Sequence, residues 1–184
     1  MDFQTSIWPY DVLNDVRPPD RDNLNHLSVF LICSFNPKDL ADDLFNIVST
    51  ACDTAGKQIN CKIECKRADK IISSGIIHAE IWREIKTSDL IIADITGLNG
   101  NVLIELGVAS ACRRKENIII LKQENQEEPF LFDIAPVRHI TYDRRKFSSA
   151  GDLLQKLIAA IIFSIPSIHL IKILKNTQIK NFLK

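Results

Sequence analysis

The sequence has no excess of charge of either sign. Its 23 Lys and Arg residues balance 23 Asp and Glu residues, so the formal net charge at pH 7 is zero. Binding to nucleic acid by counterion release needs an excess of Lys and Arg on one face. The composition therefore argues against a dedicated nucleic-acid surface.

Export and membrane signals are also missing from the sequence. The first residues lack the charged start and following apolar stretch of a secretory signal. Residues 157–171 carry no formal charge, but this stretch is too short to span a bilayer and it contains Pro166. We therefore expect a cytoplasmic protein without stable membrane insertion.

Metal-binding, phosphate-binding and triad motifs are absent too. The five cysteines are an odd number and are expected to be reduced thiols. Cys61 and Cys65 are the only close pair, and on a strand they would lie about 13 Å apart, too far to share a metal. Neither a Gly-x-Gly-x-x-Gly nor a Walker sequence is present, and no His flanks a nucleophile elbow. We predict neither a metal nor a cofactor.

Five short apolar runs alternate with segments of helical period, which predicts an α/β fold. Alternation of this kind gives right-handed βαβ units and a parallel sheet covered on both faces. We expect a flavodoxin-like, doubly wound five-stranded sheet in the order 2-1-3-4-5. Residues 27–165 would form this domain, between an N-terminal arm (1–26) and a C-terminal apolar and basic tail (166–184). The predicted strands are 27–33, 61–65, 90–93, 117–121 and 137–142, and the predicted helices are 39–55 (ended by Gly56), 75–86, 102–112 and 148–163.

Polar residues follow the predicted strands and define a candidate site. In an open parallel sheet, ligands bind beyond the carboxyl ends of the strands. The residues that leave those ends are Ser34, Phe35 and Asn36; Arg67 and Asp69; Asp94, Thr96, Gly97, Asn99 and Asn101; and Lys122 and Gln123.

Glu105 is the only charged residue between Asp94 and Arg113. It lies in a predicted helix whose faces are all apolar or small, the pattern of a buried helix. An ionised carboxylate there costs several kcal/mol unless it is paired, neutralised or faces a cleft. Glu105 is therefore either a functional carboxylate or half of a buried ion pair, with Arg67, Arg83 or Arg138 as the partner.

Two neighbours of Glu105 have predicted roles. Asn101 is a good N-cap, which would put Glu105 in the second turn near the positive end of the helix dipole. Asp94 ends the preceding strand, and two carboxylates in different environments can divide the work of a reaction. For Asp94, a turn cap is the alternative.

These residues resemble the superfamily that joins nucleoside 2-deoxyribosyltransferases to Toll/interleukin-1 receptor (TIR)-like domains. The similarity covers roughly residues 27–142, and an aromatic residue often occurs in the family where Ile104 stands. The motifs that carry it are Ser34-Phe35, Arg67-Ala-Asp69, Ile81-Trp82-Arg-Glu-Ile85, Asp89-Leu-Ile-Ile-Ala-Asp94-Ile-Thr-Gly97, Asn99-Gly-Asn101-Val, Glu105-Leu-Gly107-Val-Ala109, Phe132-Asp133-Ile and Arg138-His-Ile-Thr-Tyr142.

The resemblance implies cleavage or transfer at an N-glycosidic bond of a nucleoside or nucleotide. Glu105 would be the nucleophile, and Asp94 would hold the sugar or the nucleophile. A TIR-type NAD hydrolase of a signalling or phage-defence system is one alternative. A nucleotide-sensing, oligomerising signalling domain without turnover is another. The expected partners are a small nucleoside, nucleotide or NAD and further copies of the chain, as a homo-oligomer.

Overall fold

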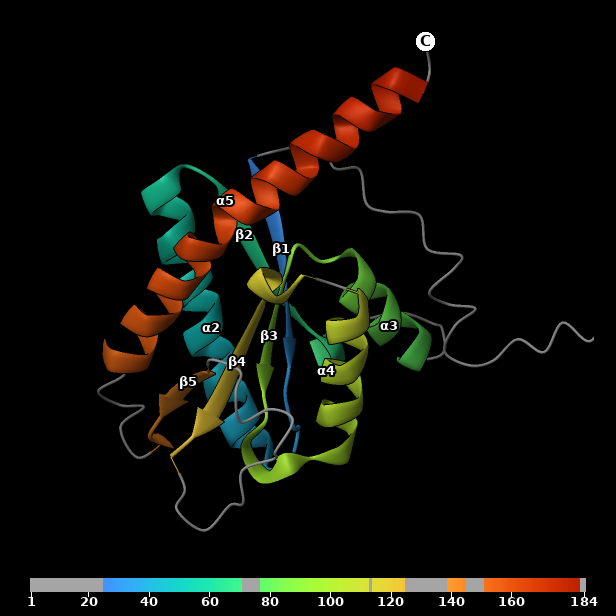
Figure 1. Ribbon diagram of the computed structural model, residues 1–184. Helices are drawn as coiled ribbons and strands as arrows, with labels where there is room; N and C mark the ends of the chain where they lie inside the picture. Colours follow the sequence, from blue (N-terminus) through green and yellow to red (C-terminus); the bar gives the residue numbers. More distant parts are fainter. Residues whose placement is uncertain (1–24, 71–76, 113, 125–138, 145–150, 183–184) are drawn as a thin grey trace, which may run out of the picture.

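The computed structural model describes residues 25–70, 77–112, 114–124, 139–144 and 151–182, so the expected arm up to residue 24 lies outside the described residues. Its centre is an all-parallel sheet of five strands in the order β2-β1-β3-β4-β5 (Figure 1). The predicted flavodoxin-like fold is therefore confirmed. The strands are β1 (His26–Ile32), β2 (Lys62–Arg67), β3 (Leu90–Asp94), β4 (Ile118–Gln123) and β5 (His139–Tyr142).

Helices cover both faces of the sheet, as predicted. Helices α2 (Lys38–Ile59) and α5 (Gly151–Phe182) lie against one face, and α3 (Ile77–Thr87) and α4 (Gly100–Cys112) lie against the other (Figure 1). Each face has its own apolar core because successive strand residues point to opposite sides. In β3, Leu90 and Ile92 belong to the α2/α5 core, whereas Ile91 and Ala93 belong to the α3/α4 core.

Helix α2 continues beyond its predicted end. Gly56 lies inside the helix, which ends at Asn60 in the left-handed conformation with φ of 53°. Gly56 is small for a packing reason, because a Cβ at this position would lie 2.4 Å from the carbonyl oxygen of Cys61. The prediction that this glycine ends the helix is thus wrong, and the close approach of the next strand explains its presence.

We expect Gly56→Ala to lower the free energy of unfolding by up to about 2 kcal/mol. The gain in helix propensity is about 1 kcal/mol, whereas forcing backbone atoms apart in a packed site costs about 1–3 kcal/mol. Gly107→Ala in α4 is the matched control, because a Cβ there meets nothing within 4 Å. In urea unfolding, the free energy of unfolding of Gly56→Ala should be lower than that of wild type, and that of Gly107→Ala should be equal to or higher than that of wild type. Equal stabilities for the two variants would contradict this account.

Helix α5 is much longer than predicted. It was expected to end at Phe163, but it continues through Pro166 to Phe182. Ile165 and Ile168 are buried on either side of the proline, so packing offsets the hydrogen bond that the ring removes. Buried apolar side chains of α5 between Leu153 and Ile168 pack against the domain, although Phe163 remains 83% exposed. Within the part of the chain that the structure describes, no helix combines the length and apolar character needed to cross a membrane.

Candidate active site

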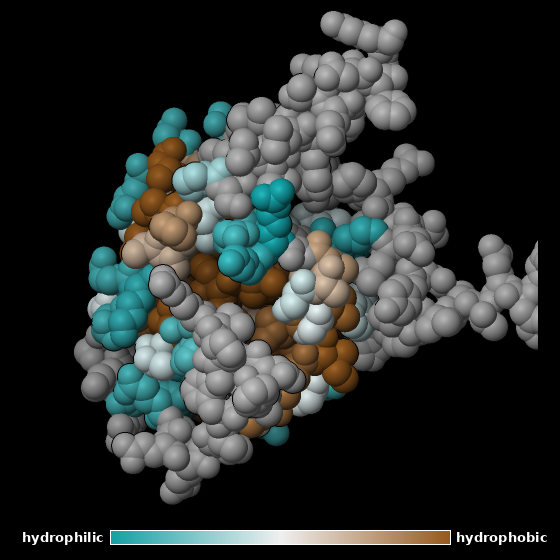
Figure 2. Space-filling view, viewed as in Figure 1, coloured by the Kyte–Doolittle hydropathy of each residue, from teal (hydrophilic) through white to brown (hydrophobic). Residues whose placement is uncertain are grey.

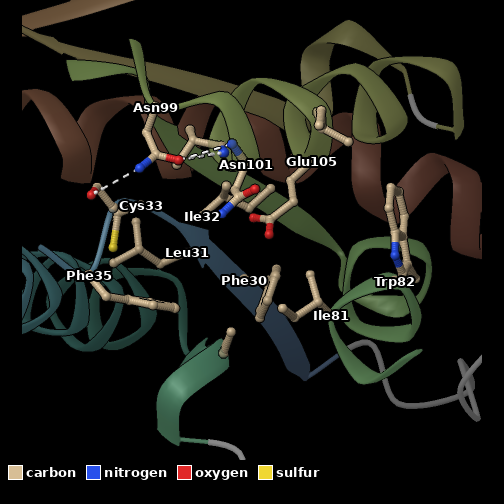
Figure 3. Close-up of a pocket in the computed structure, with 14 residues that line it drawn as sticks. Phe30, Leu31, Ile32, Cys33, Phe35, Ile81, Trp82, Asn99, Asn101 and Glu105 are labelled. Carbon is tan, nitrogen blue, oxygen red and sulfur yellow. Dashed lines mark hydrogen bonds between the residues drawn. The ribbon is translucent and has the colours of Figure 1, made fainter. Parts of the chain in front are cut away.

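A cavity of about 410 Å³ opens beside the carboxyl end of β1, between the α3 helix and the first turns of α4 (Figure 3). Its volume lies within the range of small-molecule pockets. One charged residue, Glu105, is found among the described residues that line it. The lining consists of Phe30, Leu31, Ile32, Cys33, Ser34, Phe35, Ala68, Ile81, Trp82, Asn99, Asn101, Val102, Ile104 and Glu105.

The apolar part of the cavity follows from the strand and helix periods. Phe30 and Ile32 alternate along β1 and so face the α3/α4 layer. Ile81 and Trp82 come from α3, and both side chains are buried. Site prediction from strand ends missed these four residues because it considered only the chain beyond each strand. The alternation within 27–33 was the signal that could have found Phe30 and Ile32.

Glu105 points its carboxylate into this cavity from the second turn of α4 (Figure 3). Burial raises the pKa of this carboxyl from 4.5 to about 7. No residue in the described ranges donates a hydrogen bond to the carboxylate or forms an ion pair with it. Of the ion-pair partners considered above, Arg67 binds two other carboxylates, Arg83 is exposed, and Arg138 lies outside the described residues.

The N-cap of α4 is Asn99 and not Asn101. The Asn99 Oδ1 accepts hydrogen bonds from the backbone N–H groups of Asn101 (3.0 Å) and Val102 (3.4 Å). The helix therefore begins at Gly100, earlier than its apolar pattern indicates, because the small polar residues before Val102 already adopt the helical turn. This leaves the Asn101 side chain available to line the cavity.

Helix α4 is also less buried than its composition predicts. Ile104 is 60% exposed, and Gly107 and Ser110 on the same side are exposed as well. Figure 2 shows hydrophobic residues at the surface over this helix. The expectation of a helix buried on every face is therefore wrong, because one side packs on the sheet and the opposite side faces outward.

Asp94 lies away from the cavity, in a hydrogen-bonded cluster of its own. Its Oδ1 accepts from the Thr96 hydroxyl (2.6 Å) and backbone N–H (3.2 Å), and its Oδ2 accepts from the Tyr142 hydroxyl (2.8 Å). Arg144 approaches the same Oδ2 at 3.7 Å. Burial raises the pKa of Asp94, and the Thr96 and Tyr142 hydrogen bonds oppose that rise.

Asp94 and Glu105 come from opposite faces of the sheet. Asp94 follows Leu90 and Ile92 on the face covered by α2 and α5, whereas Glu105 belongs to α4 on the other face. Asp94 is not one of the described residues that line the cavity. Its bonds to Thr96 fix the turn that leads into α4, and a direct part in a reaction stays a prediction. Tyr142 was not predicted in this cluster.

Arg67 is enclosed rather than open to a ligand. Its side chain is 0% exposed, and it forms ion pairs with Asp69 (2.6 Å) and Asp42 (2.5 Å). The ring centroids of Phe35 and Phe45 lie 5.7 Å and 5.2 Å from the guanidinium carbon. These bonds and ring contacts surround the guanidinium, so Arg67 is not among the cavity-lining residues.

Five of the predicted site residues come together around the cavity: Ser34, Phe35, Asn99, Asn101 and Glu105. The Ser34 hydroxyl accepts a hydrogen bond from the Asn99 amide (3.4 Å), which joins the loop after β1 to the start of α4. Six other predicted residues do not line the cavity: Asn36, Arg67, Asp69, Asp94, Thr96 and Gly97. Gly97 lies in the turn after β3, where its φ of 73° favours glycine.

Cys33 also lines the cavity but is a poor nucleophile. Burial raises the pKa of its thiol to about 12, against the opposing effect of Arg67. Because the thiolate is the reactive form of cysteine, Cys33 stays an inert thiol at neutral pH. Glu105 is thus the cavity residue with an ionisable group that titrates near neutrality.

The fold and the site together define an α/β domain of flavodoxin-like topology with a small-molecule cavity and one carboxylate inside it. Neither a protein-family model nor a curated protein matches the chain. A solved structure similar to it is BcmB, a CMP N-glycosidase from Clostridium botulinum, with 25% sequence identity and a TM-score of 0.44 over 71% of this chain and 96% of that chain.

Proposed function

We propose that the protein cleaves or transfers across the N-glycosidic bond of a nucleoside or nucleotide, with Glu105 as the nucleophile. The observation that carries the proposal is the Glu105 carboxylate, which faces a cavity of small-molecule size with a pKa of about 7. The similarity of the Asp94-Ile-Thr-Gly97 and Glu105-Leu-Gly107 motifs to nucleoside 2-deoxyribosyltransferases supports the same chemistry.

The proposed reaction has two steps. An oxygen of Glu105 bonds to the anomeric carbon while the C–N bond breaks, and the base departs with the bonding electrons and takes a proton from solvent water, a proton that the attacking water or incoming base returns to solvent in the second step. Water, or a second base, then attacks the same carbon and releases the Glu105 carboxylate. Ser34, Asn99 and Asn101 supply hydrogen-bonding groups at the cavity, and Phe35 supplies an apolar face for the base.

The alternatives differ in what they require of Glu105. A TIR-type NAD hydrolase would use the same carboxylate on a different substrate, so a substrate panel separates it from nucleoside chemistry. A non-catalytic sensing domain is favoured if Glu105 is locked in an ion pair, and Arg67, one partner considered for that pair, is engaged by Asp42 and Asp69.

The test is to incubate the purified protein with nucleosides, nucleotides and NAD and to measure free base by chromatography. We expect one class to release base and the others to remain intact. Release of nicotinamide alone would replace the nucleoside proposal with NAD hydrolysis. No release from any member, at enzyme concentrations comparable with substrate, would overturn catalysis and favour the sensing domain.

We expect kcat/KM for the cleaved substrate to rise with pH through about 7. The nucleophile must be ionised, and burial holds the pKa of Glu105 at about 7. Below that pH the rate should fall by about tenfold per pH unit, because the protonated carboxyl cannot attack. A pH–rate profile with its acid limb near 4 would show that an unshifted carboxylate, and not Glu105, limits the reaction.

A further inference from the structure

Phe35 forms part of the cavity wall although it lies in a loop at the surface. Its side chain is 45% exposed, and it follows β1 directly in the segment that leads to α2. Figure 3 shows its ring beside the cavity, across from Ile81 and Trp82. An aromatic ring this exposed needs a partner behind it to keep one orientation.

Arg67 is that partner. Its Nε and Nη2 atoms donate to the two oxygens of Asp69, each at 2.6 Å, and Nη2 also donates to Asp42 at 2.5 Å. Its Nη1 donates to the backbone carbonyl of Ala41. These bonds fix the plane of the guanidinium against the first turn of α2 and the turn that follows β2. The hydrogen-bonding edges are engaged within the protein, so the flat faces remain for contact with rings.

Two phenyl rings lie close to this guanidinium. The guanidinium carbon lies 5.7 Å from the Phe35 ring centroid and 5.2 Å from that of Phe45, distances at which a cation attracts an aromatic face. Phe45 comes from α2 and is not among the cavity-lining residues described, whereas Phe35 is. The same buried cation therefore holds one ring inside the domain and one ring at the cavity.

We propose that Arg67 is a positioning residue, which acts on ligand binding only through Phe35 by holding that ring as a flat wall for a nucleobase. The proposal rests on the proposed function in taking a nucleobase as the ligand. It also replaces the sequence-based expectation that Arg67 contacts the substrate itself. Lysine could not do this work, because an ammonium has neither the planar faces nor the fork that binds Asp69.

The test is a double-mutant cycle of Arg67→Lys and Phe35→Leu, with binding of free adenine, guanine, cytosine, uracil and thymine measured by saturation-transfer NMR. Either single variant should weaken binding of the preferred base by roughly three- to tenfold. In the Phe35→Leu background, Arg67→Lys should change the Kd by less than about twofold, because the wall it supports is already lost.

Two matched variants separate positioning from general loss of structure. Phe45→Leu removes the second ring beside the Arg67 guanidinium. This variant should lower the melting temperature and change the Kd for the base by less than about twofold. Arg114→Lys makes the same exchange at an exposed position remote from the cavity and should change neither quantity. If Arg67→Lys does not fold, Asp42→Asn weakens one bond of the clamp and should raise the Kd in the same direction by a smaller factor.

Three results would overturn the proposal. Equal weakening by Arg67→Lys in both backgrounds would show a direct contact with the base. A lower melting temperature with unchanged Kd would show a purely structural residue. Failure of every base to bind the wild type would show that the cavity does not take a nucleobase as its ligand. Base binding without base release would instead overturn the proposed catalysis and leave this inference standing, so the two failures are distinguishable.

Discussion

The Glu105→Gln variant is expected to lose base release by at least about a thousandfold, because the amide keeps the shape of the side chain but cannot form the covalent intermediate. KM should change little, since the cavity keeps its lining. The comparison is single-turnover base release by wild type and variant on whichever substrate the panel identifies. Glu116→Gln, an exposed carboxylate outside the cavity, is the control and should keep full activity.

The same variant should be more stable than wild type at neutral pH. The pKa of Glu105 is raised in the folded protein from 4.5 to about 7, so the folded state holds the proton more tightly than the unfolded state. Wild-type stability therefore falls, relative to the variant, as pH rises from 4.5 through 7. Above pH 7 the free energy of unfolding of the variant should exceed that of wild type by about 3 kcal/mol in urea unfolding, and below pH 4.5 the two should be equal.

Equal rates of base release by wild type and Glu105→Gln would show that Glu105 takes no part in the reaction. A variant that is markedly less stable than wild type would point instead to a structural ion pair involving this carboxylate. Loss of activity together with a stability gain confined to pH above 4.5 is the combination that the cavity geometry predicts.

Arg67→Met is expected to lower the free energy of unfolding by about 3–5 kcal/mol, which is the usual loss when one partner of a buried ion pair is removed. The methionine fills similar volume but leaves Asp42 and Asp69 facing each other without a cation. Their side chains are 37% and 30% exposed, so partial hydration should keep the loss near the lower end of that range.

Urea unfolding at neutral pH measures this loss, with Arg114→Met at an exposed site as the control. Adding Asp69→Asn to Arg67→Met should recover part of the stability, because it removes one of the two unpaired carboxylates. A loss below about 1 kcal/mol for Arg67→Met would contradict a buried cation clamp and would place this pair among ordinary surface ion pairs.

Sequence reasoning predicted the sheet well because its central strands β1, β3 and β4 are largely continuous apolar runs. β3, for example, is buried at every position, and such a run between helical segments has few other solutions. Helix ends were harder to predict. Gly56 was expected to end a helix but serves a close contact, and α5 continues past its predicted end at residue 163 because packing maintains the helix on both sides of Pro166.

The candidate site was predicted in part. Strand-end reasoning found Ser34, Phe35, Asn99 and Asn101, and the position of Glu105 as the lone charge in an apolar helix found the carboxylate. Strand-end reasoning could not tell that Arg67 turns inward to Asp42 and Asp69, because the packing of α2 against β2 decides that orientation. Asp94 was expected beside Glu105 because both lie near one sheet edge, but Asp94 is not one of the described residues that line the cavity.

The two separate cores allow amino-acid substitutions near the cavity without loss of the fold. The larger core between the sheet, α2 and α5 carries most of the buried apolar side chains. Most of the apolar cavity lining belongs to the smaller core under α3 and α4, and Leu31 and Cys33 come from the larger one. Substitutions at rim positions such as Ile104 and Asn101 act on the layer that contributes less to the fold. Substrate preference can thus drift, or be redesigned in a library, while the other layer keeps the domain folded.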